Sequence, residues 1–115
     1  MKIIDLLNAR ESAKKVFNMT FAPAKALEIR RATIAMEDEL KSYEAIVQEW
    51  AKKESIKAIT VDQLSSSQRE YWAELVSVGV KAKWDAPLTL KDLSGGSFSA
   101  AELDSLIRAN LLKED

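Results

Sequence analysis

The longest regular pattern of apolar residues in the chain lies between Pro23 and Lys53. Apolar side chains recur there at spacings of 3, 4, 4, 3, 4 and 3, at Ile29, Ala32, Met36, Leu40, Tyr43, Val47 and Trp50. Such spacing is typical of a helix with one buried face, as in helical hairpins and coiled coils. Pro23 suits the first turn of a helix, and neither Gly nor a further Pro follows it in this segment. The sequence therefore predicts one continuous helix over residues 23–53.

This helix is long for the size of the chain. About 30 helical residues form a rod of roughly 45 Å, whereas a globule of 115 residues is only about 30 Å across. A second, thinner apolar stripe is formed by Leu27, Ile34 and Ile46, so two faces of the rod are expected to be covered. We therefore predict a homo-oligomer. In the alternative, residues 3–19 and 99–112 fold back and cover both stripes within one chain.

Shorter elements are predicted on either side of the long helix. The apolar positions of residues 3–19 indicate a helix that is bent or broken near Asn8. Residues 57–61 are β-branched, and residues 80–84 alternate between apolar residues and lysine, which is typical of strands. These two segments are expected to pair as a small two-stranded β-ribbon that the helices support.

Two Ser-x-x-Glu spacings, Ser67 with Glu70 and Ser99 with Glu102, match the capping box at the start of a helix. The helix that follows Ser67 is expected to end or bend at Gly79. The predicted fold is therefore mainly α and a single helical domain over residues 1–115. Its long central helix belongs to a helical hairpin or bundle, joined by the small β-ribbon and a capped C-terminal helix.

The amino-acid composition limits the kinds of functional site that the chain can form. Apolar residues make up 47% and charged residues 30%, which is a folding composition, but the chain has no His and no Cys. Their absence excludes disulfides, cysteine-containing zinc sites, Ser–His–Asp triads and Cys–His nucleophiles. We therefore expect a protein that is not an enzyme and that has no cofactor. No apolar run approaches the roughly 18–20 residues that span a bilayer, so a cytoplasmic location without membrane contact is expected.

The charges are unevenly placed, although the net charge is only −1. Residues 1–35, the basic block, carry 7 Lys and Arg against 3 Asp and Glu, whereas residues 36–50, the acidic block, carry 1 against 5. Opposed blocks on one rod orient a partner and speed its encounter. The basic block of one chain would also attract the acidic block of a second, antiparallel chain. The small net charge makes a nucleic-acid partner the less expected one.

Candidate binding residues come from the basic block and from the aromatic end of the long helix. Lys25, Arg30 and Arg31 are candidates for an anionic partner, because guanidinium groups suit phosphate and carboxylate groups. Tyr43 and Trp50 are candidates for stacking or for burial in an interface. Two other interpretations remain: the basic residues form a solvated face that pairs with acidic residues of a neighbouring helix, and Trp50 belongs to the core.

The basic block also contains Arg10, Lys14 and Lys15. The acidic run 37–39 is interpreted as a solvated helical face. Consecutive helical residues point about 100° apart, so at most two of these carboxylates would share a metal ion. We therefore predict no metal site there.

The order of motifs resembles a family of small uncharacterised bacteriophage helical proteins. The motifs are Lys2…Leu6-Leu7, Pro23-Ala24-Lys25, Arg30 with Glu37, Glu39 and Tyr43, Trp72-Ala73-Glu74-Leu75, Leu88…Leu90…Leu93 and Ser99…Leu103…Leu106-Ile107. The resemblance implies a phage or prophage origin, action in the host cytoplasm, and a protein that works by binding. Two functions follow as expectations. One is stoichiometric binding to a host factor or an anionic signalling nucleotide, as counter-defence proteins do; the other is a structural or assembly role in the phage particle.

Overall fold

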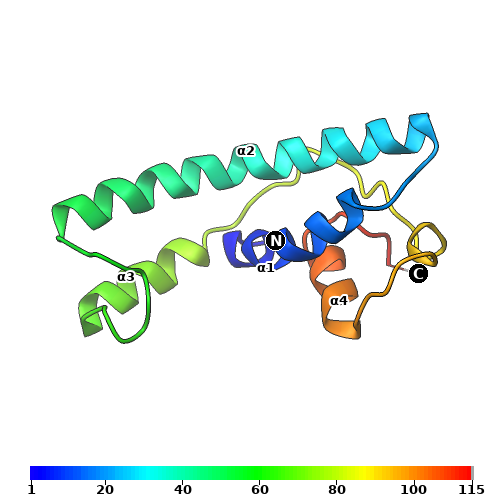
Figure 1. Ribbon diagram of the computed structural model, residues 1–115. Coiled ribbons are helices and arrows are strands. Elements are labelled where there is room, and N and C mark those ends of the chain that lie inside the picture. Colours follow the sequence, from blue (N-terminus) through cyan, green and yellow to red (C-terminus); the bar gives the residue numbers. More distant parts are fainter. Residues whose placement is uncertain (115) are drawn as a thin grey trace.

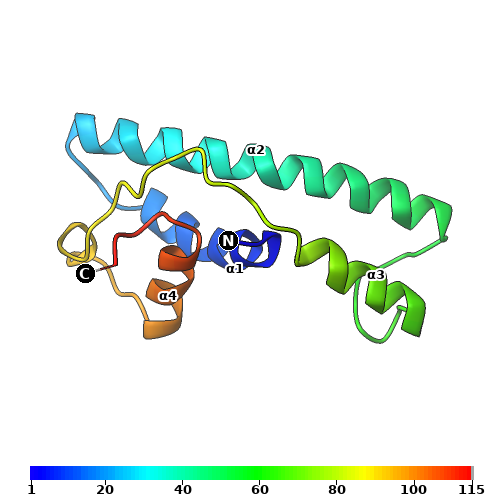
Figure 2. The same ribbon diagram turned by 180° about the vertical axis from the view of Figure 1, so that it is seen from behind.

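The computed structural model describes residues 1–114 and is mainly helical, as predicted. Its elements are α1 (Ile3–Phe17), α2 (Pro23–Lys53), α3 (Ser66–Val76), the 3₁₀ turn η1 (Lys91–Leu93) and α4 (Ala100–Arg108). Figure 1 shows α2 along one side of the molecule, with α1 beneath its N-terminal half and α3 beneath its C-terminal half. The same arrangement is seen from behind in Figure 2, where α4 packs on α1. None of the helices in this range combines the length and the apolar character that crossing a membrane requires.

The helix α2 confirms the prediction of one unbroken element over residues 23–53. Pro23 is its first residue, where the missing N–H costs no helical hydrogen bond. A helix of 31 residues is about 46 Å long, which matches the longest dimension of the molecule, 47 Å. The length of α2 therefore sets the length of the whole fold, and the shorter elements lie along it.

The first apolar stripe of α2 is buried, as predicted. Five of its residues are at most 9% exposed: Ile29, Ala32, Met36, Leu40 and Trp50. The predicted second stripe differs, because Leu27, Ile34 and Ile46 stay 44–50% exposed. At about 100° per residue, Leu27 and Ile34 lie opposite the buried stripe and Ile46 is turned by about 120° from Ile34. The three residues therefore do not form one stripe, and α1 and α4 do not fold over them within the described residues.

The core fills the space between α1, α4 and the inner face of α2. The helix α1 contributes Leu6, Ala9 and Val16, which are at most 1% exposed. The Oγ atoms of Ser12 and Ser105 are 2.9 Å apart and link α1 to α4. The helix α1 is continuous through Asn8, so the predicted break near this residue is wrong. Small and apolar residues of this unbroken helix face the core, where α1 packs on α4 and on α2.

The predicted β-ribbon is wrong, because the part of the chain that the structure describes forms isolated bridges and no strand. Residues 57–61 lie in a loop in which Val61 is 64% exposed. In residues 80–84 the alternation is real, since Trp84 is buried and the two lysines are exposed. This segment packs its apolar side chains on helices, however, and the N–H of Val80 donates to the carbonyl of Met1 at 2.8 Å. Its backbone partner is thus the N-terminus.

The helix starts are partly as predicted. Ser99 and Glu102 form the expected capping box of α4. The helix α3 starts two residues before the predicted position, because Ser65 caps it and Gln68 reaches back to the N–H of Ser65. Glutamine performs this reciprocal bond as well as glutamate does.

Candidate functional site

An open groove between α1 and α2 brings together charged and apolar side chains from both helices. Its volume is about 310 Å³, and we call it the basic groove. Four cations, two carboxylates and five uncharged residues line it: Arg10, Lys14, Arg30, Lys41; Glu37, Asp38; Ala13, Phe17, Thr33, Ile34 and Met36. Met36 is fully buried, whereas Phe17 and Ile34 are 45% and 46% exposed. The groove therefore offers positive charge beside accessible apolar surface.

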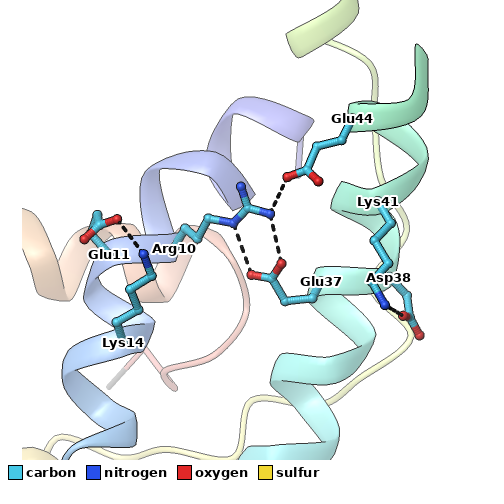
Figure 3. A network of polar contacts seen from close by, with 7 residues as sticks. All are labelled: Arg10, Glu11, Lys14, Glu37, Asp38, Lys41 and Glu44. Atoms are coloured by element: carbon cyan, nitrogen blue, oxygen red, sulfur yellow. Dashed lines mark hydrogen bonds and ion pairs between the residues drawn. The ribbon is translucent and has the colours of Figure 1, made fainter. Parts of the chain in front are cut away.

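Arg10 links the two walls of the groove. Its Nε and Nη2 donate to the two carboxylate oxygens of Glu37 at 3.2 and 2.9 Å, and Nη2 also donates to Glu44 Oε1 at 2.6 Å. Figure 3 shows this guanidinium reaching from α1 to both glutamates of α2. The hydrogen bonds to Glu37 and then Glu44 raise the pKa of Arg10 above its usual value. Arg10 is thus a permanent positive link between α1 and α2, and its Nε and Nη2 donors are already committed to the two glutamates.

The other three cations of the groove are held less firmly. Lys14 pairs with Glu11 at 3.1 Å and Lys41 with Asp38 at 3.6 Å, each within its own helix. These lysines are 64% and 75% exposed, and such surface pairs contribute little to stability. Arg30 has no carboxylate within 4.0 Å among residues 1–114, and its guanidinium lies 5.9 Å from the centroid of the Phe17 ring. These three cations remain available to a ligand.

Lys25 is placed outside the basic groove. Its Nζ donates to the carbonyl of Pro87 at 2.8 Å and lies 3.6 Å from a carboxylate oxygen of Asp92, so it ties the start of α2 to η1 and to the segment before it. Burial acts to raise the pKa of Asp92. The hydrogen bonds from Thr89 and the charge of Lys25 outweigh that effect and lower the pKa. The structure thus gives Lys25 a pairing role within the fold.

Arg31 lies on the other side of α2 from the basic groove. It lines a separate cavity of about 440 Å³ together with Lys83, Trp84 and Lys113. Arg30 and Arg31 are neighbours in a helix and therefore point about 100° apart. The three predicted cations do not converge, and only Arg30 lies in the basic groove.

Tyr43 and Trp50 connect α2 to α3. The Nε1–H of Trp72 donates to the Tyr43 hydroxyl at 3.1 Å, and the rings of Trp50 and Tyr71 have centroids 4.8 Å apart. Trp50 is only 9% exposed. Neither Tyr43 nor Trp50 lines the basic groove, so the structure does not bring them together with Arg30.

Each carboxylate of the acidic run 37–39 faces a different cation. Glu37 pairs with Arg10, Asp38 with Lys41, and Glu39 with Lys83 at 3.6 Å. Within the described residues no group of three carboxylates is placed to hold a metal ion. The basic and acidic blocks of the sequence therefore meet within one chain, mainly through Arg10.

The sequence reasoning missed Phe17, Ile34 and Lys41 as members of the same surface. Phe17 is one of the apolar positions of residues 3–19, and Lys41 is the single cation of the acidic block. The spacing contains a usable signal, because residues 30, 34, 37 and 41 recur every three or four positions and so share one side of α2. That these residues lie beside the end of α1, however, depends on how the two helices pack, which the spacing does not reveal.

Comparison with known proteins gives no further guide: no protein-family model, no curated protein and no solved structure matches this chain. The resemblance to phage proteins therefore stays a prediction from the sequence.

Proposed function

We propose that this protein is a non-enzymatic binding protein that acts stoichiometrically on a protein partner through the basic groove. The observation that carries the proposal is the position of Lys14, Arg30 and Lys41, which lack strong carboxylate partners, around the half-exposed side chains of Phe17 and Ile34. An acidic segment with apolar residues would pair with the cations and cover the apolar surface. Interfaces commonly combine an apolar centre with a charged rim in this way.

The lining of the groove favours an acidic protein segment over an anionic signalling nucleotide. Four cations and two carboxylates give the groove a net charge of only +2. A polyphosphate would be repelled by Glu37 and Asp38, and the one aromatic ring in the lining, Phe17, already stacks with Arg30. Half-exposed Ile34 suits an apolar side chain of a partner. The nucleotide remains an outcome that the experiment can detect.

The biological setting of the proposal comes from the resemblance to phage proteins. On that basis the partner is a host protein in the cytoplasm, and binding would inhibit a host defence.

A structural or assembly role in a phage particle is the second candidate. It is favoured by the outer face of α2, where Leu27, which lies outside the groove lining, is 50% exposed on a helix that extends along the whole molecule. A second copy packing there would give a homo-oligomer. Because Arg10 already pairs with Glu37 and Glu44 inside one chain, this association would depend mainly on apolar contact.

A matched pair of charge-reversal variants tests the proposed function. The first variant changes Lys14, Arg30 and Lys41 to Glu. The control changes Lys57, Arg69 and Lys91 to Glu, three exposed cations outside the groove lining. Each tagged chain is expressed in cells of the candidate host and purified, and its bound proteins and small molecules are identified by mass spectrometry.

We expect the groove variant to lose a stoichiometric partner that the parent and the control retain, with the melting temperature of both variants close to that of the parent. Retention of the partner by the groove variant, or equal loss from the control, would contradict the assignment of the groove. A phosphorylated small molecule released from the parent would instead favour the nucleotide.

A further inference from the structure

A small cavity adjoins the basic groove where α1 ends and α2 begins. Its volume is about 130 Å³, and we call it the apolar notch. It shares the lining residues Phe17 and Arg30 with the basic groove, so these two side chains lie between the two hollows. The rest of its lining is apolar: Val16, Met19, Phe21, Ala26 and Ile29.

The size of the notch limits what it can hold. An apolar cavity of about 150 Å³ in a protein interior accepts one benzene molecule. The notch is slightly smaller and opens to solvent, so it has room for one leucine, methionine or phenylalanine side chain. Its floor is rigid, because Val16 and Ile29 are 1% and 3% exposed and belong to the core.

Positive charge lies directly beside this apolar space. Arg30 lines the notch, stacks 5.9 Å from the Phe17 ring centroid, and has no carboxylate within 4.0 Å among the described residues. Lys14 and Lys41 extend the charge along the adjoining groove. An apolar side chain that enters the notch would therefore bind best if an acidic residue lies next to it in the partner, because that carboxylate would pair with Arg30.

We propose that the notch and Arg30 form an anchor site for a partner segment in which one bulky apolar side chain lies next to acidic residues. The inference rests on the proposed function and names the chemistry of the partner segment. A helical partner would place the acidic residues three or four positions from the anchor, on the same face.

The probe for this site is 1-anilinonaphthalene-8-sulfonate, which joins aromatic rings to one anion. The variant Ala26→Leu adds three carbon atoms in the notch, whereas Ala24→Leu places the same side chain on the exposed surface outside the lining. Arg30→Gln removes the charge but keeps a polar side chain. Fluorescence titration gives the affinity, and amide chemical shifts give the position of the probe.

We expect shifts at residues 16–21 and 26–30, at least tenfold weaker binding to Ala26→Leu, several-fold weaker binding to Arg30→Gln, and parental binding to Ala24→Leu. Near-ultraviolet circular dichroism checks that each variant keeps its packing, since loosely packed states also bind this dye. Equal affinity for the parent and Ala26→Leu, or shifts confined to other residues, would overturn the inference. Equal affinity for the parent and Arg30→Gln would do the same.

Partner capture separates this inference from the proposed function. If Ala26→Leu captures the partner as the parent does while the triple groove variant does not, the notch is not an anchor site, but the proposed binding through the basic groove is supported. If the triple groove variant also captures the partner, the proposed function fails.

Discussion

Replacing Arg10 by methionine removes the guanidinium that joins α1 to α2 and keeps an unbranched side chain in its place. Three hydrogen bonds of 2.6–3.2 Å are lost, two to Glu37 and one to Glu44. The two glutamates are left without this partner on the same side of α2. The Arg10→Met variant therefore measures how much the link across the groove contributes to stability.

The magnitude follows from the exposure of the three side chains. Hydrogen bonds to charged groups contribute about 1.5–3 kcal/mol when shielded from water, and exposed ion pairs about 0.2–1 kcal/mol. Arg10 is 29% exposed and the glutamates are 40% and 42% exposed, so solvent screens the pairs in part. Between these limits we expect about 1 kcal/mol for the bidentate pair with Glu37 and about 0.5 kcal/mol for Glu44. Arg10→Met should thus lower the free energy of unfolding by about 1.5 kcal/mol.

Urea unfolding at pH 7 provides the assay. With a slope of about 1–3 kcal/mol per molar urea, the midpoint of Arg10→Met should fall by about 0.5–1.5 M. A double-mutant cycle with Glu37→Gln should give a coupling free energy of about 1 kcal/mol. The control cycle uses the exposed pair of Lys14 and Glu11, for which about 0.3 kcal/mol is expected. A coupling for Arg10 no larger than that of the control would refute the reasoning.

Three further predictions concern the helix faces, the pH dependence and the oligomeric state. Met36→Asp should lower the unfolding free energy by at least about 4 kcal/mol because Met36 is fully buried, whereas Ile34→Asp should change it by about 0.5 kcal/mol. If urea unfolding gave the same loss of unfolding free energy for both variants, the buried and exposed faces of α2 would be assigned wrongly. Because the pKa of Asp92 is lowered in the fold, its stabilisation is complete above the unfolded value of about 3.9 and is lost as pH falls through the folded value. Thermal unfolding should show Asp92→Asn less stable than the parent at pH 7, with the gap closing by about pH 2; a constant gap would contradict the pairing. Light scattering at micromolar concentration should give a mass above the 12.8 kDa of one chain. A mass equal to that of one chain, unchanged by salt, would refute the oligomer.

The long helix was predictable because its determinants are local. Pro23 marks the start, no Gly or Pro follows in the segment, and the spacing of the apolar residues reports one buried face. The capping box at Ser99 was equally local. These features depend on residues three or four positions apart, which the sequence displays directly.

The β-ribbon failed because alternating burial does not reveal what covers the buried side. In residues 80–84 the apolar side chains point inward whether a strand or a helix lies beneath them. Only the backbone partner distinguishes the two cases, and Val80 bonds to Met1, at the far end of the sequence. The same pattern is therefore compatible with both folds until the tertiary contacts are known.

The candidate site was predictable only in part, for a related reason. Arg30 was identified from its charge, but Arg10 and Glu37 are 27 positions apart and their pairing depends on how α1 packs on α2. The separation of Arg30 from Arg31 follows from helix geometry alone. Grouping those two residues treated the basic block as a line of charge, whereas a helix distributes adjacent residues over different faces.

Photocrosslinking from the groove tests the central claim most directly. p-Benzoylphenylalanine is placed at Phe17 in one variant and at Tyr71 in another, two aromatic positions that are 45% and 42% exposed. We predict a saturable crosslink from position 17 to a partner protein at an acidic segment, lost when Lys14 and Lys41 are changed to Glu, and none from position 71. Equal crosslinking from both positions, or a crosslink from position 17 that survives the charge reversals, would contradict binding through the basic groove.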